Sequence, residues 1–241
     1  MTDLPLSDHI ALVTGASRGI GAATARALAA KGAHVILVAR TVGGLEATED
    51  AIHSAGGTAT IAPLDLADGD SIGRLAEAVG QRWGRLDLLV LNAAILGTLT
   101  PVPSIDATEF SRLLTLNVGA NQALIAAFDP WMRQSRGPRL VAVTSSVGAH
   151  PRAYWGGYGA SKAALETLTL AYGDEMAGLG DMRVAIVDPG ATATAMRTDA
   201  FPGEDPATLK QPDVVGNAIA DLLASDFPSG HRLRVGEPGS A

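Results

Sequence analysis

Short apolar runs alternate with amphipathic stretches along most of the chain. The apolar runs predict strands at Ile10–Thr14, His34–Ala39, Thr58–Leu64, Leu86–Asn92, Arg139–Thr144, Arg183–Val187 and Arg232–Val235. The stretches between them predict helices at Gly19–Lys31, Val42–Ala55, Gly69–Trp83, Ala107–Gln134, Gly156–Leu179 and Gln211–Ala224. Runs this apolar suit strands buried on both faces of a parallel sheet. The pattern predicts an α/β fold of the doubly wound Rossmann type, with about seven strands between two helical layers and ligands at the strand carboxyl ends.

The 241 residues are interpreted as a single cofactor-binding and catalytic domain, because no repeat or Pro/Ser-rich linker divides them. One stretch, Pro189–Pro212, is too long for an ordinary connection and is therefore either a functional lid or poorly ordered. We predict that Ala191–Lys210 is a mobile lid over the substrate. Pro202, Gly203 and Pro206 leave this segment little to pack against, and it follows the predicted cofactor site directly.

Composition removes several classes of function. The absence of Cys excludes disulfides and thiol catalysis and fits a reducing cytosol. A net charge of −7 without a basic run argues against a nucleic-acid surface. The five His residues have no ligand-like spacing, so no metal site is expected. No apolar run reaches about eighteen residues and Met1–His9 lacks the features of an export signal, so we expect no membrane span and a cytoplasmic location.

A glycine-rich loop, Thr14–Gly21, joins the first predicted strand to the first predicted helix. Its three glycines, Gly15, Gly19 and Gly21, permit a tight turn, close approach of the backbone to a phosphate and close helix packing. The helix N-terminus that follows favours the charge of a phosphate. A tight turn without a ligand is the alternative, but the position between strand and helix favours phosphate binding.

A tyrosine and a lysine stand four residues apart in a predicted helix, as Tyr158 and Lys162. Residues at this spacing share a helix face, so the phenol and the ammonium can point into one site. A cation about 4 Å from a phenolate is worth roughly 4 kcal/mol at an effective dielectric near 20, which lowers the phenol pKa by about three units. The pair is therefore a candidate acid and base, although an exposed pair without chemistry is the alternative.

The glycine loop, the Ser145-Ser146 pair after the fifth strand and Tyr-x-x-x-Lys together resemble the short-chain dehydrogenase/reductase family, from Thr14 to Val235. The resemblance implies that Tyr158 is the catalytic acid/base and that Lys162 lowers its pKa and holds the nicotinamide ribose. Ser145 would bind the substrate oxygen, because it stands thirteen residues before Tyr158 as the family pattern expects. Asn117 matches the family asparagine that supports a proton-relay water; alternatively it is a packed helix residue.

The resemblance also implies a set of cofactor contacts. These are Gly15, Ser17, Arg18, Gly19, Ile20, Gly21, Arg40, Asp65, Leu66, Asn92, Tyr158, Lys162, Pro189, Gly190, Thr192 and Thr194. Asp65 would bind the adenine amino group or cap the next segment. Thr194 would meet the carboxamide or pyrophosphate, and Thr192 would assist it or cap a turn. Leu91 and Ala94 depart from the usual Asn-Asn-Ala-Gly pattern, which leaves the adenine side and the substrate floor open.

The end of the second strand predicts which dinucleotide is used. Ala39 stands where NAD-using members of the family carry an acid, so nothing there repels a 2′-phosphate. Arg40 follows it and Arg18 lies in the glycine loop, so two guanidinium groups can converge on that phosphate. Each could instead be an ordinary surface arginine. The expected cofactor is NADP(H).

The leading hypothesis is an oxidoreductase that transfers a hydride between NADP(H) and a small carbonyl or alcohol substrate. A catalytically inactive NADP(H)-binding regulator is the alternative. A lyase or epimerase of the longer relatives is disfavoured, because their glycine spacing and added C-terminal domain are missing. The sequence leaves the substrate and the direction of the reaction open.

Two further expectations concern surfaces. Tyr154, Trp155 and His150 lie where family members line the substrate pocket, although packing in a core or an interface is the alternative. The resemblance and the long apolar helices near Phe110–Met132 and Ala163–Met176 predict a homodimer or homotetramer.

Overall fold

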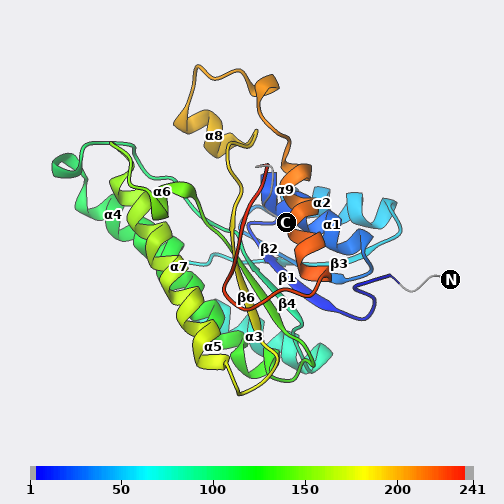
Figure 1. Cartoon of the computed structure of the whole chain (residues 1–241). Helices are drawn as coiled ribbons and strands as arrows, with labels where there is room; N and C mark the ends of the chain where they lie inside the picture. Colours follow the sequence, from blue (N-terminus) through cyan, green and yellow to red (C-terminus); the bar gives the residue numbers. More distant parts are fainter. Residues whose placement is uncertain (1–3, 237–241) are drawn as a thin grey trace.

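A seven-stranded parallel sheet forms the centre of the computed structural model, which describes residues 4–236 (Figure 1). The strands are β1 (Ile10–Thr14), β2 (His34–Ala39), β3 (Thr58–Pro63), β4 (Leu88–Leu91), β5 (Arg139–Val143), β6 (Arg183–Asp188) and β7 (His231–Arg234). They run in the order β3-β2-β1-β4-β5-β6-β7. The order reverses between β1 and β4, and a doubly wound sheet binds ligands at that point. The predicted fold class is confirmed.

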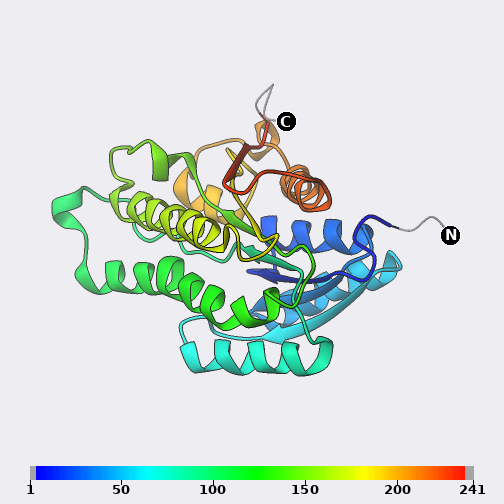
Figure 2. The same ribbon diagram turned by 60° about the horizontal axis from the view of Figure 1, so that its bottom comes forward.

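Helices cover both faces of the sheet (Figure 2). One layer contains α1 (Gly19–Ala30), α2 (Val42–Ser54) and α9 (Pro212–Ala224), and the other contains α3 (Gly69–Trp83), α5 (Ala120–Met132) and α7 (Gly156–Met176). Successive strand residues enter opposite cores, because side chains alternate along a strand. In β1, Ala11 and Val13 pack in the core under α1, whereas Ile10 and Leu12 pack in the core under α5. This two-sided burial explains why the strands are continuous apolar runs.

The predicted helix over Ala107–Gln134 is interrupted, which corrects that expectation. It divides into α4 (Ala107–Leu114), a π-helical turn (Thr115–Gly119) and α5. The buried Asn117 lies in this turn, where its side chain both accepts from the backbone N–H of Ile95, at 2.9 Å, and donates to the Ile95 carbonyl, at 2.8 Å. π-Helical turns within α-helices often occur at functional sites. The turn therefore fastens the helix to the loop after β4.

The stretch between Pro189 and Pro212 is more ordered than the sequence predicts. It contains α8 (Ala195–Ala200) and a 3₁₀ turn (Pro206–Thr208). Its two ends are tied together, because the Ala193 N–H donates to the Lys210 carbonyl at 2.9 Å. Its middle packs on the rest of the protein through Phe201, whose ring centroid lies 5.7 Å from that of Trp155. Within 191–210 only Thr192 is buried, which agrees with the expectation that the segment has little to pack against, and its mobility stays a prediction.

The remaining elements are short. They are a 3₁₀ turn (Val102–Ser104) before α4 and α6 (Ser146–Ala149) after β5. Within residues 4–236, no helix combines the length and the apolarity that a membrane crossing requires. Residues 1–3 and 237–241 of the predicted domain lie outside the described range.

Candidate active site

A cavity of about 910 Å³ opens at the carboxyl ends of the central strands. Most of the residues that the sequence proposed line it: Gly15, Ser17, Arg18, Gly19, Ile20, Arg40, Asp65, Leu66, Asn92, Ser145, Tyr158, Lys162, Pro189, Gly190, Thr192 and Thr194. Two proposed residues, Gly21 and Asn117, are buried behind its wall. The fold therefore gathers segments that are distant in sequence at one edge of the sheet.

The glycine loop is shaped by two steric requirements. Gly15 has φ +67°, a conformation that residues with a Cβ seldom adopt. A Cβ on Gly21 would lie 2.2 Å from the carbonyl oxygen of Gly15, so only glycine fits there. Asn92 holds the loop against β4, because its Nδ2 donates to the Thr14 carbonyl at 2.8 Å. The loop ends at the N-terminus of α1, whose free N–H groups favour an anion.

Tyr158 and Lys162 lie together on α7 at one end of the cavity. They are 8% and 2% exposed, so the alternative of an exposed pair is wrong. The Lys162 Nζ donates to the Val143 carbonyl at 2.9 Å and lies 5.6 Å from the Tyr158 ring centroid. The Tyr158 hydroxyl donates to the Met196 Sδ at 3.8 Å. The four-residue spacing thus directs both side chains to one site, as predicted.

The pKa values of this pair differ from the sequence prediction. Burial lowers the pKa of Lys162 to about 8, although the nearby Glu166 carboxylate opposes the change. Burial raises the pKa of Tyr158 and the Asp188 carboxylate raises it further, so the predicted lowering is wrong for this arrangement. The physical reason is that loss of solvation outweighs the attraction of a lysine that is bound to the Val143 carbonyl. Lys162 is the member of the pair with a pKa close to neutrality.

A buried polar link joins the π-helical turn to α7. The Nδ2 of Asn117, which is fully buried, lies 3.1 Å from the Ser161 Oγ, and Ser161 donates to the Tyr158 carbonyl at 2.7 Å. The contacts of Asn117 match a packed helix residue, and its part in a proton relay stays a prediction. Ser161 was missed by the sequence reasoning, although it lies inside the Tyr-x-x-x-Lys motif three residues after Tyr158.

Of the aromatic residues and His150 that were expected to line the substrate pocket, only Trp155 lines the cavity near the Tyr158 phenol. Ser145 lines the cavity just before α6, and Trp155 lines it with its ring centroid 6.0 Å from that of Tyr158. Tyr154, which is 60% exposed, and His150 lie outside the cavity, so that expectation is wrong for both. Met196 was missed, because no local sequence pattern connects it with a tyrosine on another helix.

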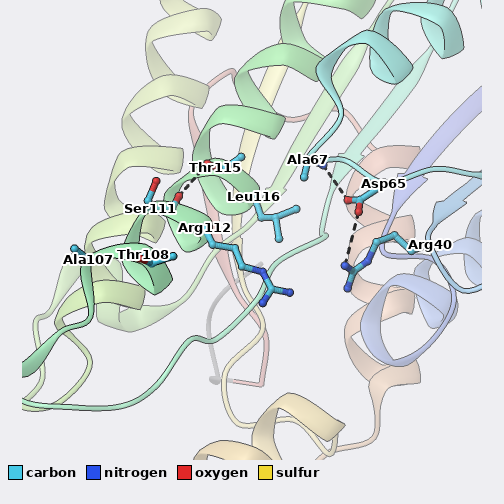
Figure 3. A pocket seen from close by; sticks show the side chains of 9 residues that line it. All are labelled: Arg40, Asp65, Ala67, Ala107, Thr108, Ser111, Arg112, Thr115 and Leu116. Carbon is cyan, nitrogen blue, oxygen red and sulfur yellow. Dashed lines mark hydrogen bonds and ion pairs between the residues drawn. The ribbon is translucent and has the colours of Figure 1, made fainter.

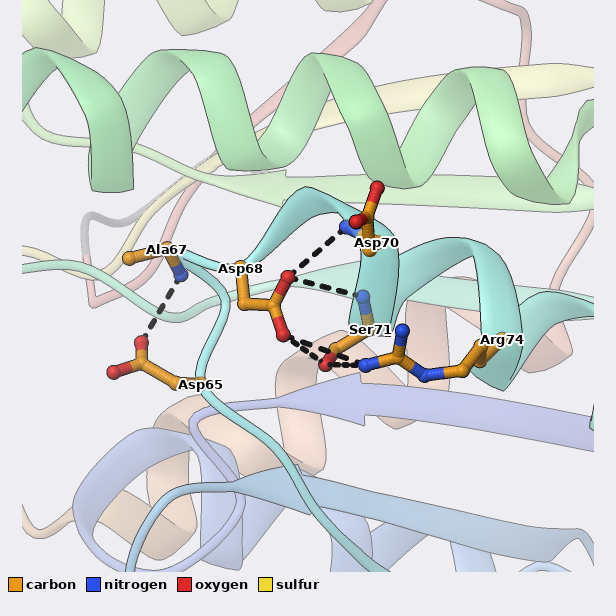
Figure 4. A network of polar contacts seen from close by, with 6 residues as sticks. All are labelled: Asp65, Ala67, Asp68, Asp70, Ser71 and Arg74. Atoms are coloured by element: carbon orange, nitrogen blue, oxygen red, sulfur yellow. Dashed lines mark hydrogen bonds and ion pairs between the residues drawn. The ribbon is translucent and has the colours of Figure 1, made fainter.

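At the opposite end of the cavity, Asp65 makes two contacts. Its Oδ1 accepts from the Ala67 N–H at 3.0 Å, and its Oδ2 lies 3.9 Å from the Arg40 Nη1 (Figure 3). Asp68 rather than Asp65 caps α3, since its Oδ1 accepts from the N–H groups of Asp70 and Ser71 (Figure 4). The Ser71 hydroxyl also donates to Asp68 and lowers the pKa of that carboxyl. Asp65 therefore closes a local turn and points its other oxygen toward Arg40.

The two threonines after β6 stabilise local structure. Thr192 is 3% exposed and its hydroxyl donates to the Pro189 carbonyl at 3.1 Å, which matches the turn-capping alternative. Thr194 caps α8, because its Oγ1 accepts from the Arg197 N–H at 3.2 Å. Within residues 4–236, no group of three His, Cys, Asp or Glu side chains is placed to hold a metal ion.

Two residues that depart from the family motif take different positions. Leu91 is 1% exposed and packs in the core between the sheet and α5. Ala94 lines the cavity beside Asn92. The departure at Ala94 therefore bears on the shape of the site, whereas the departure at Leu91 bears on packing.

Comparisons with known proteins agree with the fold. The family model for short chain dehydrogenases matches residues 9–205. The chain is 37% identical over 224 residues to YciK, an uncharacterised oxidoreductase of Escherichia coli, covering 92% of this chain and 88% of that protein. A short chain dehydrogenase from Pseudomonas syringae superposes with a TM-score of 0.93 at 38% identity, over 96% of each chain. A short chain dehydrogenase from Shigella flexneri, complexed with NADP, gives a TM-score of 0.90 at 35% identity, over 97% of this chain and 99% of that one. The resemblance seen in the motifs is thus confirmed, and the chain belongs to the short chain dehydrogenase family.

Proposed function

We propose that this chain is an NADP(H)-dependent oxidoreductase that interconverts a carbonyl and an alcohol, with Tyr158 as the acid/base. The observation that carries the proposal is the burial of Tyr158 and Lys162 side by side at one end of the cavity, with Ser145 on the same wall. Perturbed pKa values in a cleft mark candidate catalytic groups. The similar Shigella flexneri structure in complex with NADP supports the choice of cofactor.

The residues of the cavity fit a dinucleotide. The loop at Gly15 has no space for a side chain, because a Cβ there would lie 2.8 Å from the Asn92 Nδ2 and 3.1 Å from the Ala93 Cα. A backbone cradle at the N-terminus of α1 suits a pyrophosphate. Gly15, Ser17, Gly19 and Ile20 would hold the pyrophosphate side, and Arg18 and Arg40 the 2′-phosphate. Asp65 and Leu66 would hold the adenine. Asn92, Tyr158 and Lys162 would hold the nicotinamide ribose, and Pro189, Gly190, Thr192 and Thr194 the carboxamide side. When bound, NADP(H) supplies or accepts the hydride.

The residues after β2 favour the phosphorylated dinucleotide. Arg40 and Arg18 line the same cavity, and Ala39 beside them carries no charge. Guanidinium groups bind phosphate through paired, charge-assisted hydrogen bonds. The weak 3.9 Å contact between Arg40 and Asp65 leaves the Arg40 side chain 57% exposed, so it is accessible to a ligand. We infer that these residues select NADP(H) over NAD(H).

Proton transfer follows from the environment of Tyr158. The raised pKa keeps the phenol protonated, which is the form that donates to a substrate oxygen during carbonyl reduction. Ser145 would orient that oxygen with its hydroxyl. The phenolate that remains lies beside the Lys162 ammonium, whose charge stabilises it at pH values below about 8. Lys162 then returns a proton to the phenolate, directly or through water held near Asn117.

An inactive NADP(H)-binding regulator is the second candidate, and one experiment separates it from an enzyme. NADPH oxidation is followed across a panel that contains an acyl-thioester ketone, a steroid, a sugar, a quinone and a small aldehyde. Turnover that requires Tyr158 supports the oxidoreductase. Tight NADPH binding without turnover on any member of the panel, or with oxidised NADP and the corresponding alcohols, contradicts it and supports the regulator.

A further inference from the structure

A second cavity, of about 650 Å³, opens between α4 and the carboxyl ends of β2 and β3 (Figure 3). Arg40, Asp65 and Leu116 line both this cavity and the larger one. The two spaces therefore meet at the end of the cleft that lies away from Tyr158. Any group that extends from the larger cavity past Arg40 enters the smaller one.

One face of α4 forms the outer wall of this second cavity. Thr108, Ser111 and Arg112 of α4 line it together with Thr115, the first residue of the π-helical turn, and their spacing of three and four residues places them on one side of the helix. The Thr115 hydroxyl donates to the Ser111 carbonyl at 2.9 Å and is thus committed to the helix backbone. Arg112 extends from this face across the cavity, toward the side that carries Arg40 (Figure 3). The wall consequently places the positively charged Arg112 side chain in the space between α4 and Arg40.

The charges of the cavity are unbalanced. Its lining contains two guanidinium groups, from Arg40 and Arg112, and one carboxylate, from Asp65. Asp65 lies 3.9 Å from Arg40, whereas no acidic side chain among residues 4–236 lies within ion-pair distance of Arg112. A phosphate monoester carries about −1.5 to −2 charges at neutral pH, which two guanidinium groups can match. A ribose hydroxyl has no charge for them to match.

We propose that Arg112 contacts the 2′-phosphate of NADP(H) from the wall opposite Arg40, so that α4 takes part in cofactor selection. This inference rests on the NADP(H)-dependent function proposed above. Arg40 approaches the phosphate from the end of β2 and Arg112 approaches it from α4. The planar guanidinium of Arg112 can offer two N–H donors to the phosphate oxygens. Arg112 would thus be a specificity-determining residue that no motif around the glycine loop contains.

The test compares cofactor affinities of Arg112→Ala with those of the wild type by isothermal titration calorimetry. The probes are NADPH, NADH and adenosine 2′,5′-bisphosphate, at low and at physiological salt. Because Arg112 is exposed, we expect NADPH and adenosine 2′,5′-bisphosphate to bind roughly threefold to tenfold more weakly, with the loss shrinking at higher salt. NADH affinity should be unchanged, and Arg112→Lys should restore part of the NADPH affinity.

Arg136→Ala is the matched control, because Arg136 is also exposed but precedes β5 at the opposite edge of the sheet. It removes the same charge and should leave all three affinities unchanged. Equal weakening by Arg136→Ala, or equal weakening of NADH and NADPH by Arg112→Ala, would overturn the inference. If Arg40→Ala weakens NADPH binding and Arg112→Ala does not, the inference fails while NADP(H) selection stands. Equal wild-type affinities for NADPH and NADH would instead overturn the proposed cofactor preference itself.

Discussion

The two ends of the main cavity are built from differently exposed groups. At the end that holds the proposed catalytic residues, Asn117 is fully buried, Lys162 is 2% exposed and Tyr158 is 8% exposed. At the other end, the side chains of Arg40 and Asp65 are 57% and 49% exposed. Burial shifts the pKa of a group, and acid–base catalysis depends on such shifts. Exposure keeps a charged side chain in contact with water and accessible to a phosphate. We therefore expect substitutions at the buried end to have the larger effects.

The largest effect is expected for Tyr158→Phe. It removes the proposed proton donor while the ring stays in place, so turnover should fall at least ~100-fold with little change in NADPH affinity. Steady-state rates and calorimetric binding measure the two quantities. Tyr172→Phe is the control, because Tyr172 is also buried on α7 but its hydroxyl donates to Asp129, at 2.9 Å. Retention of most of the wild-type turnover by Tyr158→Phe would contradict the assignment.

The buried end should also produce a pH-dependent stability. Lys162 has a pKa of about 8 in the folded chain against an ordinary value of 10.5, so the unfolded state binds more protons between these pH values. The contribution of Lys162 to the free energy of unfolding should therefore rise by about 2 kcal/mol from about pH 7 to about pH 10. Urea unfolding at several pH values, compared between wild type and Lys162→Met, measures this contribution.

Lys31→Met is the control for that measurement, because Lys31 lies at the end of α1, where its ammonium is 2.7 Å from the exposed Asp221 carboxylate. Its substitution should leave the slope of unfolding free energy against pH between 8 and 10 close to that of the wild type. Parallel pH profiles for wild type and Lys162→Met would show that the burial of Lys162 does not determine the slope. That result would contradict the view that burial at the Tyr158 end of the cavity determines the protonation energy of its residues.

A smaller effect is expected at the exposed end. A charge-assisted hydrogen bond contributes roughly 1.5–3 kcal/mol, which corresponds to about tenfold to a hundredfold in affinity. Because Arg40 is 57% exposed, we expect Arg40→Ala to weaken NADPH binding by about tenfold, at the lower end of that range, and NADH binding hardly at all. Dissociation constants of both cofactors for the wild type and the variant test this. A loss shared equally by NADH would mean that Arg40 does not read the 2′-phosphate.

The smallest free-energy change is expected for the closure of the segment 191–210. We predict that it closes over the substrate, so its amide hydrogens should exchange more slowly in the NADPH complex than in the free protein. The pair of hydrogen bonds from Arg197 to Glu204 and the contact of Phe201 with Trp155 show that the segment is ordered in the free chain. Hydrogen exchange with mass spectrometry measures the difference. Equally strong protection in both states would refute the lid.

Local sequence rules were sufficient for the strands, for most of the long helices and for the pairing of Tyr158 with Lys162. The strands are apolar on both faces because helices cover both faces of the sheet, and that pattern is visible in the chain. The spacing of Tyr158 and Lys162 places them on one helix face whatever surrounds them. The glycines at 15 and 21 are required by backbone geometry at a strand-to-helix turn. Each of these features depends on residues that are neighbours in sequence.

Tertiary structure determined the environment of those side chains, and with it their pKa values and contacts. Burial raises the pKa of Tyr158, contrary to the prediction from its neighbour Lys162 alone, because solvation depends on every segment that covers the site. The π-helical turn arises where the Asn117 side chain binds the backbone of Ile95 in a different loop. Arg112 faces the side that carries Arg40 because the fold places α4 across the second cavity from the residues that follow β2 and β3 (Figure 3). Contacts between distant segments have no periodicity or spacing in the chain, so only the folded structure determines them.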